Sequence, residues 1–299
     1  MTAVLASSPA RSDNLRGILA MLAAMGSLIV NDSFLKLAAA ELPTGEAIFL
    51  RGVFATVLCV TLVGATEGLG ALRLAAGPWV AGRAAADVLA TILYLSALMH
   101  MPIAAATAIL QFAPLAITAG AALLLGAHVG WRRWLATLVG LAGVLIIVRP
   151  GGAGFNAHAL LALSAIAFLA ARDLLTRRVG AAVPTMVVAA ASSAAVAAGS
   201  AGLSLFEVWI WPSGHALLLL LLAGVALLGG NTWIVVAMRT GEIAAVAPFR
   251  YSAGLWAIVA GFVVWGEVPD LATWVGSAIV SGAGVYTILR ESRLARVGQ

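Results

Sequence analysis

The feature that most constrains this chain is a succession of ten apolar runs with little sequence between them. A helix needs about 20 consecutive apolar residues to cross the hydrocarbon core of a bilayer. Proline, glycine and clustered charges separate the runs from one another. The runs cover roughly residues 15–40, 44–66, 77–99, 102–126, 131–149, 155–178, 184–207, 214–238, 243–265 and 270–290. The sequence therefore predicts an all-α polytopic membrane protein with ten transmembrane helices.

Composition supports this fold class. Hydrophobic residues make up 63% of the chain and charged residues 10%, whereas soluble domains carry roughly a quarter charged residues. Lipid requires every backbone polar group to be satisfied internally, which long apolar runs achieve as helices. A transmembrane barrel would instead show alternating segments of about 10 residues. Residues 1–14 lack the apolar core of a signal peptide, so we expect the first run to be retained as a span.

Several classes of function are excluded by what the sequence lacks. Cys59 is the only cysteine, which excludes a disulfide or thiolate site within one chain. The histidines lie near span ends without ligand spacing, and they are His100, His128, His158 and His215. There is no Walker motif for ATP and no His/Asp/Glu cluster at helical spacing within the bilayer. We therefore expect no metal, no cofactor and no enzymatic activity.

The basic residues are distributed unevenly between the two sets of loops. One set, with the termini, holds Arg11, Arg16, Arg73, Arg132, Arg133, Arg177, Arg178, Arg239, Arg290, Arg293 and Arg296. The other set holds Arg149 together with Glu41, Glu207, Glu267 and Asp270. Positive loops stay on the cytoplasmic side, so both termini are expected there. The net charge of +5 then reflects topology and anionic lipid, not nucleic acid. Only one of 17 basic residues is a lysine, which favours a GC-rich bacterium and hence its plasma (inner) membrane.

The chain also matches itself at an offset of 140–141 residues. The matched segments are Asn31-Asp32 with Arg172-Asp173, Lys36 with Arg177, Pro43-Thr44 with Pro184-Thr185, Ile103-Ala104-Ala105 with Ile243-Ala244-Ala245, Gly126 with Gly266, and Trp134 with Trp274. We predict one repeat over 1–150 and a second over 151–299, joined at the glycine-rich stretch 150–154. Because each repeat holds five spans, the second copy should be inverted in the bilayer, as in many transporters.

These short motifs resemble those of the EamA-type members of the drug/metabolite transporter superfamily. The resemblance covers nearly the whole chain, and it is carried by Asp32 and Lys36, Pro43-Thr44, Ile243-Ala244-Ala245 and Gly266-Glu267. Gly126-Ala127 departs from the family's usual Gly-Glu. The resemblance implies two inverted five-helix halves and transport of a small solute. Within the superfamily the chain is most similar to bacterial exporters of amino acids and related metabolites.

Two spans contain paired weak points in their helices. Span four holds Pro102, Pro114 and Gly120, and span nine holds Pro248, Gly254 and Gly261. Proline removes a backbone donor and glycine tolerates the bend that follows. We interpret Pro114, Gly120, Pro248, Gly254 and Gly261 as hinges of a rocking mechanism. The alternative is ordinary proline and glycine, which membrane helices tolerate.

Charged residues within spans are costly unless they face protein or water. Asp32 and Lys36 are one turn apart and can pair as structural charges at a helix end. Glu46 and Arg51 begin span two and could line an outer vestibule. Further charged candidates lie within spans three and nine.

Arg83 and Asp87 are one turn apart in span three. They form either an interior ion pair or a proton-coupling site at Asp87. Arg250, beside Pro248, could receive a substrate carboxylate or extend to the inner interface. These readings stay open at the level of the sequence.

The remaining candidates are amide, hydroxyl and aromatic side chains that would suit a small, partly apolar zwitterion. With Arg250, the predicted cavity residues are Tyr94, Gln111, Ser164, Phe168, Asn231, Tyr251 and Trp256. Each alone could equally be a packing residue.

The expected function is export of neutral, aromatic or hydrophobic amino acids and related metabolites by alternating access. Residues 17–30 of the first span contain no acidic residue, which favours facilitated diffusion over proton antiport. The alternative is a proton-coupled exporter of cationic drugs, with Asp87 as the coupling group. Ten spans suffice for a complete pathway, so a monomer in the lipid bilayer is the expected state.

Overall fold

The computed structural model describes residues 11–125, 130–150, 156–176, 178–180, 182–240 and 243–297. The helices of the first half are α1 (Arg11–Ala38), α2 (Thr44–Thr66), η1 (Leu69–Ala76), α3 (Pro78–Met99), α4 (Ile103–Leu110), α5 (Ala113–Leu125) and α6 (Trp131–Val148). Those of the second half are α7 (His158–Thr176), α8 (Thr185–Ser204), α9 (Gly214–Thr240), α10 (Ile243–Val246), η2 (Ala247–Tyr251), α11 (Ser252–Trp265) and α12 (Leu271–Val297). The all-α fold predicted from the sequence is confirmed.

Ten helical segments of the described chain are long and apolar enough to cross a membrane, and they match the ten predicted runs. Large apolar side chains cover the outside of the bundle, as lipid contact requires. Leu123 is 72% exposed and Val263 is 73% exposed. In a soluble protein such a surface would aggregate, so the exposed apolar groups support a multi-pass membrane protein.

Spans four and nine are interrupted within the bundle. The helix of span four ends at Leu110 and starts again at Ala113, with Pro114 as its next residue. Span nine contains the 3₁₀ segment η2, which includes Pro248. Proline cannot donate to the carbonyl four residues before it, so a regular α-helix is interrupted at both places.

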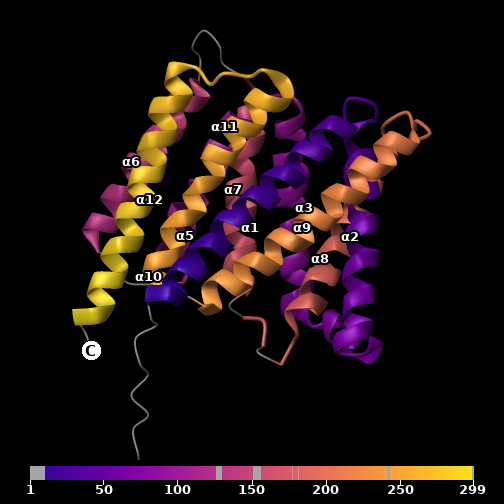
Figure 1. Cartoon of the computed structure of the whole chain (residues 1–299), viewed down its shortest axis with the longest axis horizontal. Coiled ribbons are helices and arrows are strands. Elements are labelled where there is room, and N and C mark those ends of the chain that lie inside the picture. The colour runs from indigo at the N-terminus through magenta and orange to yellow at the C-terminus, as the bar shows by residue number, and fades with distance from the viewer. Residues whose placement is uncertain are drawn as a thin grey trace, which may run out of the picture.

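The helices pack in pairs that join the two halves of the chain. α1 packs against α9, α3 against α7, α2 against α8, and α6 against α12. In Figure 1, α6 and α12 lie at one side of the bundle and α2 and α8 at the other, with α1 near the centre. If α1–α3 are matched in order with α7–α9, the α1–α9 contact becomes the α7–α3 contact. This exchange is what two related halves would produce, and the division at residue 150 stays a prediction.

The helix ends form two faces. We call the face that carries Arg73, Arg132, Arg133, Arg178, Arg239 and Arg290 the arginine-rich face. The opposite face carries Glu41, Arg149, Glu207, Glu267 and Asp270. α1 begins and α12 ends on the arginine-rich side, at the lower edge of Figure 1.

Some sequence predictions fall outside the described residues. They are Gly126-Ala127, His128, the linker residues 151–154 and Arg177. The side chains of Arg11, Ile243, Ala244, Arg293 and Arg296 are likewise outside the described set.

Candidate functional site

The two interrupted spans meet at their breaks. The side-chain amide of Gln111 donates a hydrogen bond of 3.1 Å to the backbone carbonyl of Tyr251, and its oxygen accepts one of 2.9 Å from the Ser281 hydroxyl. Gln111 lies between α4 and α5, and Tyr251 ends η2. Both side chains are buried. A polar contact thus connects the two irregular segments and α12 inside the bundle.

Glycines allow the close approach at this point. A Cβ at Gly254 would lie 2.7 Å from Nε2 of Gln111. One at Gly261 would lie 3.3 Å from Cγ2 of Ile103, at the start of α4. Gly120 has more room, with Leu174 at 3.5 Å. Gly254 and Gly261 therefore have a packing reason to be glycine, while their role as hinges stays a prediction.

A buried polar network links α1, α2 and α3 inside the bundle. It lies closer to the opposite face than to the arginine-rich face. The carboxylate of Asp32 accepts hydrogen bonds from the Tyr94 hydroxyl at 2.9 Å and the Asn31 amide at 2.8 Å. The oxygen of Asn31 accepts from the Arg51 guanidinium at 3.3 Å. Asn31, Arg51 and Tyr94 are buried. This network places one carboxylate and one guanidinium inside the bundle, bridged by the side-chain amide of Asn31.

Lys36 belongs to a second cluster nearer the opposite face. Its ammonium lies 3.2 Å from the Glu267 carboxylate, donates to the carbonyl of Met101 at 2.8 Å and lies 4.8 Å from the ring centroid of Trp265. Glu267 also accepts the backbone N–H of Ile103 at 3.2 Å, at the positive end of α4. The pairing of Lys36 with Asp32, which their spacing allowed, is therefore wrong. Lys36 instead ties α1 to the segments that flank both interrupted spans.

A cavity of about 280 Å³ opens beside this cluster on the opposite face. Its polar lining comes from Arg149, Asn156, Glu267, Asp270 and Thr273, and its apolar lining from the start of α4 and the end of α6. The size approaches the lower end of small-molecule sites, which begin at about 300 Å³.

Two carboxylates at the rim of the opposite face, Asp270 and Glu41, accept hydrogen bonds from neighbouring side chains. The hydroxyl and backbone N–H of Thr273, with the Arg149 guanidinium beside them, hold the pKa of Asp270 below its usual value. The Ser213 hydroxyl at 2.6 Å and His215 at 2.9 Å lower the pKa of Glu41 in the same way. These contacts join neighbouring loops and favour the ionised form of both groups.

A third polar network lies inside the bundle, closer to the arginine-rich face than to the opposite face. Arg83 and Asp87 lie 3.8 Å apart as an ion pair, which is one of the two roles that the sequence left open. Arg172 of α7 lies closer to Asp87, at 3.0 Å, and also pairs with Asp173 at 2.8 Å. Arg83 further donates to the hydroxyls of Thr176 and Ser192. Asp87 is thus held between two guanidinium groups that connect α3, α7 and α8.

The other predicted cavity residues do not gather at one point. Ser164 and Asn231 are exposed and Phe168 is half-buried on α7. Trp256 is 42% exposed and donates its indole N–H to the carbonyl of Leu22 at 3.1 Å. Arg250 is exposed within η2. The role of these residues as substrate contacts stays a prediction.

Sequence reasoning missed the main partners in these networks. Arg172 appeared only as the repeat equivalent of Asn31, yet it is the closest cation to Asp87. The repeat itself held the signal, since it matches Asn31-Asp32 with Arg172-Asp173. The pairing of Glu267 with Lys36 across 231 residues had no signal in the spacing.

Glu46 and Arg51 do not line an open vestibule as the sequence suggested. Glu46 is fully buried, with one carboxylate oxygen accepting the backbone N–H of Ile210 at 3.0 Å. Arg51 is 5% exposed and faces Asn31. The prediction was wrong because the segment before α9 folds over the start of α2. Among the described residues, no group of three or more metal-binding side chains gathers.

Comparison with known proteins agrees with this architecture. Residues 15–149 match the EamA-like transporter family. The chain is 28% identical to a riboflavin transporter of Rhizobium johnstonii over 68% of this chain and 67% of that protein. It is 26% identical to an S-adenosylmethionine uptake transporter of Rickettsia prowazekii over 93% and 94% of the two chains.

Two further likenesses cover most of the chain. A pseudopaline exporter of Pseudomonas aeruginosa is 26% identical over 88% of this chain and 93% of its own length. A protein of known crystal structure superposes with a TM-score of 0.63 at 26% identity, covering 95% and 98% of the two chains. Residues 15–149 thus form an EamA-like domain of the drug/metabolite transporter superfamily, and the ten-helix chain is similar over most of its length to proteins named as transporters and not as enzymes.

Proposed function

We propose that this protein exports amino acids and related small metabolites across a bacterial inner membrane by alternating access. The observation that carries the proposal is the contact between Gln111 and Tyr251, which joins the breaks of spans four and nine. Interrupted helices at equivalent places in two repeats form the substrate site of many transporters. Two halves that exchange their shapes around such a point can open the site to each side in turn.

The orientation in the membrane follows from the arginine-rich face. With that face in the cytoplasm, both termini are cytoplasmic and the cavity beside Glu267 opens outward. The proposed halves are residues 1–150 and 151–299, and one chain contains the whole pathway. A monomer therefore suffices for transport.

The proposed substrate contacts are polar and aromatic side chains of the helices around the breaks. They are Ser164, Phe168, Asn231, Arg250 and Trp256, with Tyr94 nearer the opposite face. Gln111 and Tyr251 have a different proposed role, because their bonds to each other fix the breaks. Amide and hydroxyl groups beside aromatic rings suit a zwitterion with a partly apolar body.

The similar proteins support a small organic substrate but do not identify which one. Those that we compared are named for riboflavin, S-adenosylmethionine and pseudopaline, and they include both uptake transporters and an exporter. S-adenosylmethionine is itself an amino-acid derivative, which supports an amino-acid cargo. Export is proposed from the resemblance found in the sequence.

Transport without proton coupling is supported by the partners of Asp87. A coupling carboxylate must exchange its proton and its partners as the site changes sides. Asp87 lies between Arg83 and Arg172, which suits a structural role in joining α3 to α7. Among the described residues Asp32 has neutral donors, Tyr94 and Asn31, as its hydrogen-bond partners. The alternative, proton-coupled export of cationic drugs, therefore has Asp32 as its better candidate.

The test is uptake of radiolabelled solutes into liposomes containing the purified protein, with and without a pH gradient. The panel contains neutral aliphatic amino acids, aromatic amino acids, S-adenosylmethionine, riboflavin and a quaternary ammonium dye. Amino-acid exchange that is independent of the gradient supports the proposal. Dye transport that requires the gradient, with inert amino acids, would support the alternative, and Asp32→Asn should then abolish the pH dependence.

Substitutions separate the proposed contacts from the rest of the helix surface. Asn231→Leu should raise the half-saturation concentration for the transported solute, because an amide partner is lost. Thr232→Val is the matched control, since that hydroxyl bonds the carbonyl of Leu228 in its own helix. An equal effect of both variants would contradict a substrate contact at Asn231.

A further inference from the structure

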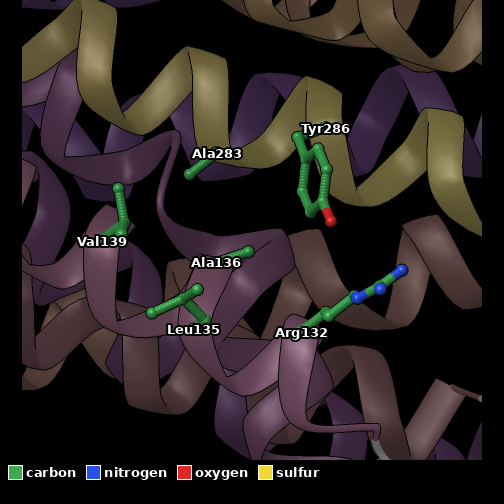
Figure 2. Close-up of a pocket in the computed structure, with 6 residues that line it drawn as sticks. All are labelled: Arg132, Leu135, Ala136, Val139, Ala283 and Tyr286. Carbon is green, nitrogen blue, oxygen red and sulfur yellow. The ribbon is translucent and has the colours of Figure 1, made fainter.

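A groove lies between α6 and α12 at their arginine-rich ends, away from the interrupted spans. It has a volume of about 260 Å³ and is lined by Arg132, Leu135, Ala136, Val139, Ala283 and Tyr286. None of these six lining residues takes part in the polar networks described above. Figure 2 shows the lining side chains between the two helices.

The groove is polar at one end and apolar along the rest of its length. The guanidinium of Arg132 and the hydroxyl of Tyr286 lie at the same end in Figure 2, whereas Val139, Leu135 and Ala283 lie toward the other. Leu135 is 53% exposed and Val139 is 44% exposed. An occupant must therefore combine a polar group with an apolar chain.

The positions of the lining residues along α6 and α12 place the polar end of the groove near the membrane surface. Arg132 is the second residue of α6, and Tyr286 lies one turn before Arg290, where the last candidate span ends. Trp131 is 70% exposed, and the Arg132 guanidinium lies 5.3 Å from its ring centroid. Tryptophan and arginine at a span end mark the headgroup level. The apolar part of the groove then lies in the hydrocarbon region.

The positive charge at the polar end of the groove favours a negatively charged occupant. Arg132 is at the start of α6, where unpaired backbone N–H groups give the helix its positive end. Arg290 lies four residues after Tyr286 on α12 and adds charge at the same level. The lining residues include no carboxylate. An isologous interface with a second copy would bring two Arg132 side chains together, so the charge disfavours self-association here.

We propose that this groove binds an anionic phospholipid of the leaflet at the arginine-rich face. Its phosphate accepts hydrogen bonds from the Arg132 guanidinium and the Tyr286 hydroxyl, and one acyl chain lies along Leu135 and Val139. A charged phosphate with a guanidinium forms a strong charge-assisted pair. Such a lipid bridges α6 and α12 and stabilises the folded state by mass action. This inference is independent of the cargo and direction proposed above.

The test is native mass spectrometry of the detergent-purified protein titrated with phosphatidylglycerol or phosphatidylcholine. Wild type should bind phosphatidylglycerol more tightly, and Arg132→Gln should weaken that first binding step by about tenfold or more. Tyr286→Phe should weaken it less, because one neutral hydrogen bond is lost. Phosphatidylcholine has the same phosphate beside a choline cation, so its weaker binding should fall by a smaller factor in Arg132→Gln.

Arg239→Gln is the matched control, because Arg239 lies on the same face at the end of α9. Equal losses in Arg132→Gln and Arg239→Gln would overturn the proposal in favour of diffuse attraction. An unchanged phosphatidylglycerol affinity in Arg132→Gln would also overturn it. A shift between monomer and dimer in the same spectra, without a change in lipid binding, would identify a subunit interface instead. Lipid-free thermal unfolding of each variant checks that the fold is intact.

Discussion

The side chain of Gln111 donates a hydrogen bond to the backbone carbonyl of Tyr251, 140 residues later in the chain. That separation equals the offset at which the sequence matches itself. Each residue stands at the break of its own span, so equivalent breaks contact one another inside the bundle. The contact therefore joins the two halves at the place where each half is least regular.

Substitution of Gly254 is the most direct test of the contact between the two breaks. A Cβ there would lie 2.7 Å from Nε2 of Gln111, so Gly254→Ala should displace the amide and lower the thermal unfolding temperature. Gln111→Ala should also destabilise, by about 1–3 kcal/mol, because a buried carbonyl and hydroxyl lose this partner. In the double variant the clash is absent, so the two losses should not add. Strictly additive losses in a double-mutant cycle would contradict direct contact between the two positions.

A second close approach joins α6 and α12. A Cβ at Gly143 would lie 2.9 Å from Cγ2 of Ile279 and 3.0 Å from the backbone oxygen of Gly276. Gly143→Ala should therefore separate the helices and cost about 1–3 kcal/mol in unfolding free energy. Gly282→Ala on α12 is the control, because a Cβ there meets nothing within 4 Å. A Gly143→Ala variant as stable as Gly282→Ala would refute the close crossing.

The spans could be predicted from the sequence because lipid imposes length and hydropathy on each helix separately. The ten predicted runs and the ten candidate spans agree for that reason. The ion pair of Arg83 and Asp87 was also accessible, since both residues lie on one helix at a fixed spacing. Local geometry decides such features, and local geometry can be read from sequence.

Contacts between helices could not be predicted in the same way. Lys36 and Asp32 have suitable spacing, but the rotation of α1 directs Lys36 toward Glu267. Glu46 looked accessible because it starts a span, yet residues before α9 cover it. Rotation and loop packing depend on all neighbouring helices together. The proposed substrate contacts, such as Asn231 and Ser164, depend on these same quantities and stay predictions.

Asp270 should give the stability a defined acid dependence. Its pKa in the folded protein lies below the usual value, so its contribution is complete above the unfolded pKa of about 3.9. That contribution is lost as the pH falls through the lower folded value. Asp270→Asn should therefore lower the unfolding temperature near neutral pH, and this effect should become progressively smaller as the pH falls below about 3.9.

The size of this effect should be small. The Asp270 side chain is 53% exposed, so its pairing with Arg149 contributes under about 1 kcal/mol. Asp270→Ala is the comparison, because it also removes the side chain that accepts the Thr273 N–H at the start of α12. Losing that cap should cost about 0.5–2 kcal/mol at every pH. Identical pH profiles for wild type and Asp270→Asn would contradict the lowered pKa.

Neutralising two carboxylates near the start of α2 should change the stability differently. Glu207 accepts the backbone N–H of Gly45 at 2.9 Å and 3.1 Å, at the positive end of the helix. Glu207→Gln should therefore destabilise by about 0.3–1 kcal/mol. Glu46 is fully buried, and one of its oxygens has no hydrogen-bond partner in the described structure.

Glu46→Gln keeps an oxygen that can accept the N–H of Ile210 and removes the cost of burying a charge. It should leave the thermal unfolding temperature unchanged or raise it, measured beside Glu207→Gln in the same detergent. The comparison holds the chemical change constant and varies only the surroundings of the carboxylate. If Glu46→Gln lost as much stability as Glu207→Gln, the Glu46 charge would have a stabilising partner, and its burial could not be described as a cost.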